Sequence, residues 1–276
     1  MTLLLSRGKL SFENNIHTIL ELSSTQLSKD IQIKHLLTHT SGIADDADET
    51  KGEDFSALFI DTPNYAFREN KDFLPNFAYK EADFKPGEKI YYNNCAFILL
   101  GLIIEKITGK RYRDFITEEI FQTFHMNHTF FAAKEDSDKP FAEGYYFNKN
   151  NELKKNIYSF PPIGTADSGA YTTVTDLDIF IRQINNSPIY RKMLSPQTNL
   201  KIQENNGYYT MGFGFDLLES KGKIVKAYKE GRNAGVRNIT AFYPANDVTF
   251  TILGNVDSNV WQLHEKSENI LFNESI

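Results

Sequence analysis

The sequence of 276 residues has one cysteine, no excess of basic residues and no long apolar run. A single cysteine, Cys95, excludes an intrachain disulfide, so the cysteine content says nothing about the redox compartment. No stretch approaches the ~20 apolar residues that span a bilayer, and the apolar opening, residues 1–5, is too short for the core of a signal peptide. A net charge of -6 and a pI of about 5.6 give no general attraction to nucleic acid or to an anionic membrane.

Apolar residues make up 41% of the chain and charged residues 24%, as in an ordinary globular protein. Helical spacing of apolar residues predicts helices over 31–39, 95–108, 112–124 and 173–185. Alternation then predicts two hairpins and a last helix, over 211–218, 223–229, 238–243, 248–253 and 259–272. Because helices precede strands instead of alternating with them, the pattern indicates an α+β fold. We expect one domain over 1–276, with a mainly helical lobe at about 30–200 and an antiparallel sheet with a C-terminal helix at about 205–276.

Local signals mark several boundaries of these segments. Gly42 and Gly109 can each stop the helix before them, and residues 220–222 predict the turn of the first hairpin. Thr175 is expected to cap the helix over 173–185. We expect a solvated loop, in preference to a metal site, where six carboxylates cluster: Asp45, Asp46, Asp48, Glu49, Glu53 and Asp54.

Two strings in the first third of the chain are distinctive. Residues 31–42 read I-Q-I-K-H-L-L-T-H-T-S-G, and residues 86–94 read P-G-E-K-I-Y-Y-N-N before an apolar helix that ends in T-G. Both resemble strings of the family of serine β-lactamases of class C, D-Ala-D-Ala peptidases and their esterase relatives. The first string is scaffold in that family. His35 and His39 are spaced to face one metal, but no glutamate of an H-E-x-x-H motif lies between them, and a structural role is favoured.

The second string places Tyr92 and Asn94 on the family's Y-x-N motif, and the register of the following helix disfavours Tyr91. A phenol with the ordinary pKa of about 10 is a poor base at neutral pH, and it becomes useful only where cations favour the phenolate. Asn94 offers both a donor and an acceptor to a substrate amide. The alternative for Tyr92 is a buried aromatic side chain whose hydroxyl is satisfied by hydrogen bonding.

Two further strings match the family nearer the C-terminus. Residues 168–177 resemble a lining loop and helix cap, and Lys229, Glu230 and Gly231 fall on the K-T-G or H-x-G strand motif. The resemblance implies that Lys229 adds positive potential beside the phenol and that Gly231 leaves room for substrate along the strand edge. Glu230 replaces a hydroxyl that meets a substrate carboxylate, so it is expected to repel such a group, and Arg232 can offset this.

The family's acylation needs S-x-x-K at the start of a central helix. The two such strings here, Ser6 to Lys9 and Ser220 to Lys223, lie at the chain terminus and in a predicted hairpin turn. The resemblance of residues 3–11 to the segment after the nucleophile helix leads us to expect that the sequence begins after the nucleophile, without the family's first strands. An uncovered strand edge then predicts a marginally stable or aggregation-prone chain.

The leading hypothesis is a serine hydrolase by descent, with an acyl-enzyme mechanism on peptidoglycan-like peptides, β-lactams or small esters. Its catalytic residues here are Tyr92, Asn94 and Lys229, and its substrate-binding residues are Glu230, Gly231 and Arg232. The alternative is a non-catalytic fragment or pseudoenzyme that binds a ligand or a partner. A metallohydrolase using His35 and His39, or His125 and His128, is disfavoured, and no cofactor is implied. Relatives usually work outside the cytoplasm, but no export signal supports this here, and the oligomeric state is not indicated.

Overall fold

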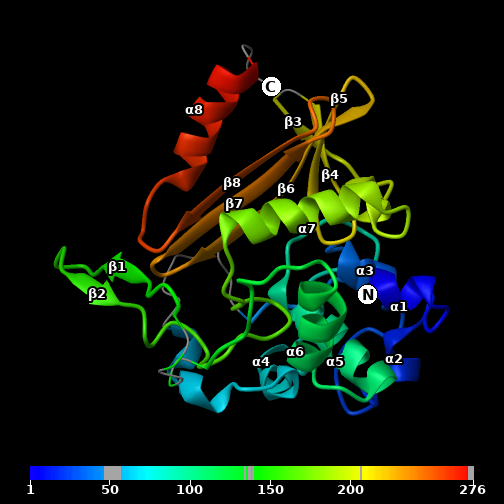
Figure 1. The fold of residues 1–276 in the computed structure, drawn as a ribbon. Coiled ribbons are helices and arrows are strands. Elements are labelled where there is room, and N and C mark those ends of the chain that lie inside the picture. The colour runs from blue at the N-terminus through cyan, green and yellow to red at the C-terminus, as the bar shows by residue number, and fades with distance from the viewer. Residues whose placement is uncertain (47–56, 134, 136–137, 139, 206, 273–276) are drawn as a thin grey trace.

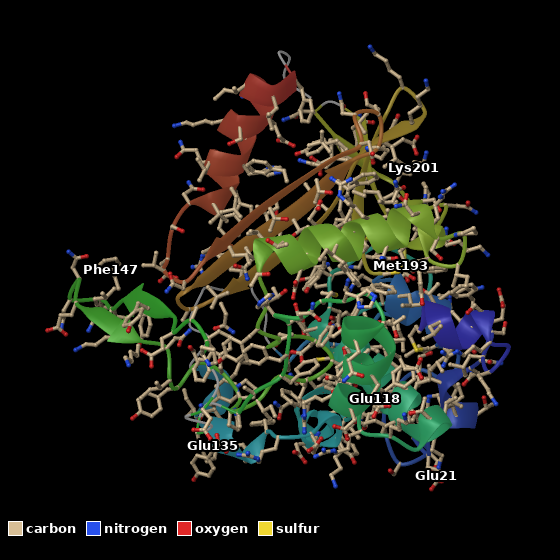
Figure 2. All side chains as sticks on the ribbon, in the orientation of Figure 1. Glu21, Glu118, Glu135, Phe147, Met193 and Lys201 are labelled. Atoms are coloured by element: carbon tan, nitrogen blue, oxygen red, sulfur yellow. The ribbon has the colours of Figure 1, made fainter. Side chains whose placement is uncertain are left out.

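The computed structural model describes residues 1–272 except 47–56, 134, 136–137, 139 and 206. Its first two thirds are mainly helical: α1 (Thr2–Ser6), α2 (Ile16–Ile19), α3 (Ile33–Leu37), α4 (Leu74–Phe77), α5 (Asn94–Thr108), α6 (Tyr112–Ile116) and α7 (Val174–Asn186). Short 3-10 turns lie at Ala57–Phe59, Asn64–Ala66, Asn70–Phe73 and Arg191–Leu194, and a small hairpin pairs β1 (Tyr145–Phe147) with β2 (Leu153–Lys155). Figure 2 shows Phe147 on this hairpin, which projects from the body of the protein.

The last third forms an antiparallel sheet of six strands in sequence order. The strands are β3 (Ile202–Glu204), β4 (Gly207–Met211), β5 (Asp216–Ser220), β6 (Lys223–Asn233), β7 (Val236–Tyr243) and β8 (Val248–Gly254), followed by α8 (Val260–Phe272). The pairing of β5 with β6 shifts register between Leu218 and Glu219, and beyond this bulge Lys229 lies opposite Thr240 of β7. β8 is an edge strand of this sheet.

Helices α7 and α8 cover opposite faces of the sheet (Figure 1). Alternation along β7 shows this, because Phe242 packs in a cluster with α7 while Tyr243, the next residue, bonds His264 of α8. The α7 cluster also contains Ala227 of β6, so the odd-numbered positions of β6 near Lys229 face α7.

The core of the helical part is built around α5. Asn93 caps the start of α5 by accepting a hydrogen bond from Ala96 N–H, and Gly109 ends it at a φ of 69°. Met193 packs against both this core and the α7 cluster, and Figure 2 shows it close to α7. The sheet and the helical part therefore share an apolar contact that fixes β5 and β6 relative to α5.

The α+β class and the positions of the main predicted elements are confirmed, but several bounds were wrong. The predicted strand 211–218 is interrupted between β4 and β5, because Gly214 has a φ of 80° and a Cβ at Gly212 would lie 2.1 Å from Met193 O. Helix α3 is shorter than predicted, and the predicted helix 112–124 passes from α6 into a π-helical turn at Thr117–Gln122. Thr173, not Thr175, caps α7 by accepting from Asp176 N–H.

Four carboxylates of the expected acidic loop, at positions 48, 49, 53 and 54, lie outside the described residues. None of the described helices has the length and apolar character required to cross a membrane. The division into two lobes stays a prediction.

Candidate functional site

Tyr92 is held in the segment that leads into α5. Tyr91 N–H donates to His39 O at 2.8 Å, and Asn93 N–H donates to His39 Nδ1 at 3.1 Å. The residues on either side of Tyr92 are thus bonded to His39, whose ring centroid lies 4.5 Å from that of Tyr92. The tyrosine itself stays 39% exposed. A short extended segment anchored at both ends therefore presents the phenol at the surface.

Two adjacent asparagines have different roles at the start of α5. Asn93 is 2% exposed; its side chain caps the helix and donates to Ile43 O at 2.8 Å. Asn94 is half-buried, and its Oδ1 accepts a hydrogen bond from the Tyr92 hydroxyl at 3.1 Å. The cap orients the first turn, and this turn brings the Asn94 amide to the phenol.

Lys229 reaches the same phenol from the sheet. Its Nζ lies 4.3 Å from the centroid of the Tyr92 ring, in a cation–π contact. The ammonium also pairs with Asp216 Oδ2 at 3.0 Å, and Asp216 Oδ1 accepts from the Tyr209 hydroxyl at 2.6 Å. Burial, with Asp216 adding to it, raises the pKa of Tyr209, so this phenol remains a hydrogen-bond donor at neutral pH. The Tyr209 hydroxyl therefore fixes the Asp216 carboxylate, which in turn positions the Lys229 ammonium.

His39 packs behind Tyr92 as a neutral imidazole. Burial, with the nearby Lys229 ammonium adding to it, lowers the pKa of His39 well below 6.5. Because Nδ1 accepts from Asn93 N–H, the ring proton is assigned to Nε2, which has no hydrogen-bond partner among the described residues. His39 also has a φ of 51°, in the left-handed region that few residues other than glycine adopt. It supports the phenol without adding a second charge.

The three residues that follow Lys229 on β6 do not all face Tyr92. Glu230 lies beside the Trp261 indole of α8, and burial raises the pKa of its carboxyl group. The Arg232 guanidinium lies 5.9 Å from the Trp261 ring, on the same side of β6 as Glu230. Gly231 returns to the side of Lys229. The structure thus brings Tyr92, Asn94 and Lys229 together and places Glu230 and Arg232 toward α8, so alternation along the strand separates the Glu230 side chain from the phenol.

Two of the histidines in the disfavoured metal alternatives bond a backbone N–H through a ring nitrogen. His35 Nδ1 accepts a hydrogen bond from Gln32 N–H, and His39 Nδ1 accepts one from Asn93 N–H. In the part of the chain that the structure describes, three or more potential ligands converge only at Asp45, Asp46 and Cys95. There the thiol donates to Asp45 Oδ1 at 3.4 Å, and burial, reinforced by Asp46, raises the pKa of Asp45 to about 8. Protonated groups that bond each other are poor metal ligands.

Neither S-x-x-K string lies at the start of a helix. Ser6 is the last residue of α1, and its hydroxyl donates to Leu3 O at 2.8 Å. Ser220 ends β5, and the turn to Lys223 carries Lys221 and Gly222 at positive φ. Sequence reasoning also missed Tyr209 and Asp216. The only signal for this pair was the carboxylate of Asp216 at the start of β5.

Comparisons with known proteins found a matching family model, similar sequences and similar structures. The Beta-lactamase family model matches residues 1–272. Penicillin-binding protein 4* of Bacillus subtilis is 28% identical over 239 residues, which are 81% of this chain and 51% of that protein. Protein flp of Staphylococcus aureus is 32% identical over 180 residues, 64% of this chain and 33% of that protein. The chain thus spans about half the length, or less, of these curated relatives.

A solved structure is similar over nearly the whole chain. The penicillin-binding protein from Bacillus halodurans superposes with a TM-score of 0.88 at 31% identity, covering 98% of this chain and 81% of that one. This fold match and the family match cover the same segments that carry Tyr92, Asn94 and Lys229. The chain therefore belongs to the Beta-lactamase family.

Proposed function

We propose that this chain carries the Tyr92, Asn94 and Lys229 part of a serine-hydrolase site that acts on peptidoglycan-like peptides, β-lactams or small esters. The observation that carries the proposal is that two groups converge on Tyr92: the Lys229 ammonium lies 4.3 Å from the ring centroid, and the Asn94 amide oxygen lies 3.1 Å from the hydroxyl. A neighbouring ammonium favours a phenolate, whereas the hydrogen bond that the hydroxyl donates to Asn94 favours the phenol, so Tyr92 can act as a base once a ligand takes over the Asn94 amide. The arrangement therefore suits a group that takes a proton from an attacking hydroxyl and returns it to a leaving group.

The roles follow from the donors and acceptors. The Tyr92 oxygen is the proton acceptor, Lys229 stabilises the negative charge that it carries, and the Asn94 amide is available to a substrate amide. Covalent catalysis also needs a serine that bonds the carbonyl carbon, releases the leaving group and is freed by water. The positions of Ser6 and Ser220 support the proposal that this serine and its lysine belong to a segment other than residues 1–276.

The same positions favour a second candidate, a module that binds such ligands without turning them over. Removal of the nucleophile from a covalent catalyst costs several orders of magnitude in rate, while binding contacts can persist. Both candidates share the site at Tyr92 and differ only in turnover.

The test combines covalent labelling with binding. The chain is incubated with a fluorescent penicillin and a chromogenic ester, and its intact mass and the release of product are followed. We expect no stoichiometric adduct, and we expect measurable reversible binding of N-acetyl-D-alanyl-D-alanine or of its C-terminal amide. An adduct on any serine of this chain would overturn the proposal about the nucleophile.

A matched pair of variants localises the binding. Tyr92→Phe removes the hydroxyl that a ligand at this site would meet, and loss of one hydrogen bond to the ligand is expected to weaken binding by about 2- to 10-fold. Tyr91→Phe is the control, because Tyr91 is adjacent and equally exposed, at 40% against 39%. Equal effects of the two changes would remove Tyr92 from the proposed site.

A further inference from the structure

The ammonium of Lys229 already has a carboxylate partner before any ligand arrives. Asp216 Oδ2 lies 3.0 Å from Nζ, and the Asp216 side chain is only 12% exposed. Its other oxygen accepts from Tyr209 at 2.6 Å, so the carboxylate has little freedom to swing away. A ligand at the phenol therefore meets a lysine–aspartate pair and not an isolated cation.

The strand around Lys229 adds little that binds a negative charge. Gly231, on the same side, has no side chain, and Glu230 and Arg232 lie toward Trp261. The hydroxyl directly across from Lys229 belongs to Thr240, which is buried and accepts from Thr251 Oγ1 at 3.3 Å. A carboxylate drawn to Lys229 would come close to Asp216 with no hydroxyl of residues 229–231 to hold it.

We propose that Asp216 is a specificity-determining residue, which by pairing with Lys229 disfavours ligands that carry a carboxylate and leaves the site selective for uncharged amides and esters. The inference rests on the proposed function of the site at Tyr92 and names the class of substrate that this site takes. Two like charges several ångströms apart in a partly solvated site repel by an amount worth on the order of tenfold in affinity. Replacement of Asp216 by a neutral isostere should convert this repulsion into attraction to Lys229.

The experiment compares two ligands that differ in one charge. Affinities of the full chain for N-acetyl-D-alanyl-D-alanine and for its C-terminal amide are measured by NMR titration, and the ratio of the two is taken. For wild type we expect the amide to bind at least as tightly as the acid. In Asp216→Asn the affinity for the acid, relative to the affinity for the amide, should rise about tenfold. Added salt should reduce this rise.

Glu219→Gln is the matched control. Glu219 lies on the same strand, is 13% exposed and pairs with Lys201 at 2.6 Å, so its loss breaks an equivalent ion pair away from the phenol. We expect this variant to leave the ligand ratio unchanged. The fold of each variant is checked by its backbone NMR spectrum.

The outcomes separate the inference from the proposed function. An unchanged ratio in a folded Asp216→Asn variant overturns the role of Asp216 and leaves the proposed function of the site at Tyr92 untouched. A tenfold preference of the wild type for the acid overturns it as well, without any substitution. Failure of both ligands to bind overturns the proposed function, and the specificity inference with it.

Discussion

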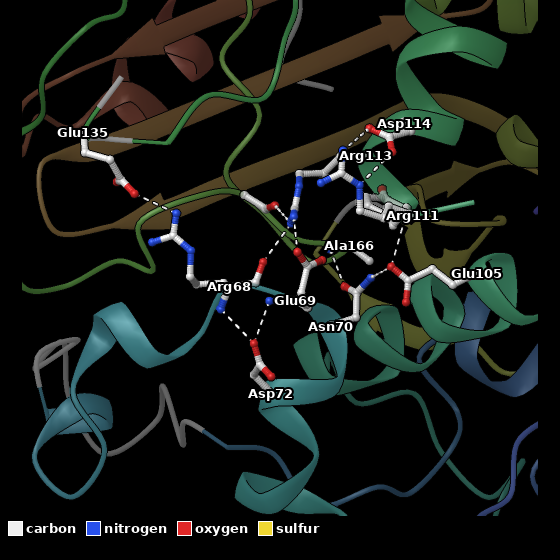
Figure 3. Close-up of polar contacts among 12 residues, drawn as sticks. Arg68, Glu69, Asn70, Asp72, Glu105, Arg111, Arg113, Asp114, Glu135 and Ala166 are labelled. Carbon is white, nitrogen blue, oxygen red and sulfur yellow. Dashed lines mark hydrogen bonds and ion pairs between the residues drawn. The ribbon is translucent and has the colours of Figure 1, made fainter. Parts of the chain in front are cut away.

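Asn70 makes a buried connection between three segments of the helical part, and its removal gives a sharp test of how that part is held together. The side chain is 1% exposed; its Oδ1 accepts from Ala166 N–H at 3.0 Å and its Nδ2 donates to Glu105 Oε1 at 3.1 Å (Figure 3). Glu105 also accepts from Tyr112 N–H at 3.0 Å. Asn70→Ala thus detaches the loop at 166 from α5 and weakens the junction of α5 with α6.

The expected cost follows from the two lost bonds. A hydrogen bond to a carboxylate contributes about 1.5–3 kcal/mol, and a buried amide left without a partner costs about 1–3 kcal/mol. We therefore expect Asn70→Ala to lower the free energy of unfolding by roughly 3–5 kcal/mol. For a chain of this size, such a loss should lower Tm by about 6–20 °C.

Urea unfolding followed by circular dichroism measures the effect, with Asn148→Ala as the control. Asn148 also bonds a glutamate, Glu152, at 2.9 Å, but in the exposed turn between β1 and β2, where water replaces the lost partner. We expect this control to cost less than about 1 kcal/mol. If the two variants differ by less than about 1 kcal/mol, burial does not set the strength of these bonds, and the reasoning fails.

Three further changes test single features. Thr249→Val replaces a buried hydroxyl that has no partner among the described residues, so it should stabilise the chain by up to about 1 kcal/mol in urea unfolding. Asp45→Asn should stabilise increasingly as the pH rises from about 4 to about 8, because burial raises the pKa of Asp45 from 3.8 to about 8 and ionisation then opposes folding. Thr173→Ala should cost about 1 kcal/mol through loss of the α7 cap, while Thr175→Ala should be close to neutral.

Each of these has an outcome that counts against it. A loss of more than 1 kcal/mol in Thr249→Val would mean that the hydroxyl is bonded in solution, for example through water. A constant difference between Asp45→Asn and wild type across the pH range would exclude a raised pKa. Equal costs at positions 173 and 175 would mean that the helix begins differently in solution.

Much of the fold could be predicted because its signals are local. The α5 helix has an unbroken apolar face, a capping asparagine before it and Gly109 after it, so periodicity and caps agree. The wrong predictions concern segments whose conformation depends on contacts with distant parts of the chain. Glycine and phenylalanine alternate at residues 212–215 as they would in a strand. The strand is nevertheless interrupted there, where Met193 O lies close to Gly212.

The candidate site divides in the same way. Tyr92, Asn94 and Lys229 could be proposed from strings that keep their order along the chain, and the structure brings them into contact. The partners Asp216 and Tyr209 could not, because their bond depends on the register between β4, β5 and β6. Nor does a sequence string show which side of β6 Glu230 occupies, since that depends on the position of the bulge at Leu218.

The bulge between Leu218 and Glu219 makes the length of the β5–β6 hairpin a determinant of the charge that Tyr92 meets. Side chains along a strand alternate, so inserting one residue between this bulge and position 229 would rotate Lys229 toward α8 and turn the Glu230 carboxylate toward the phenol. Inserting two residues would return Lys229 to the phenol's side of β6, about 7 Å further along the strand. Homologous hairpins should therefore tolerate even changes in length and resist odd ones, unless a second bulge restores the parity.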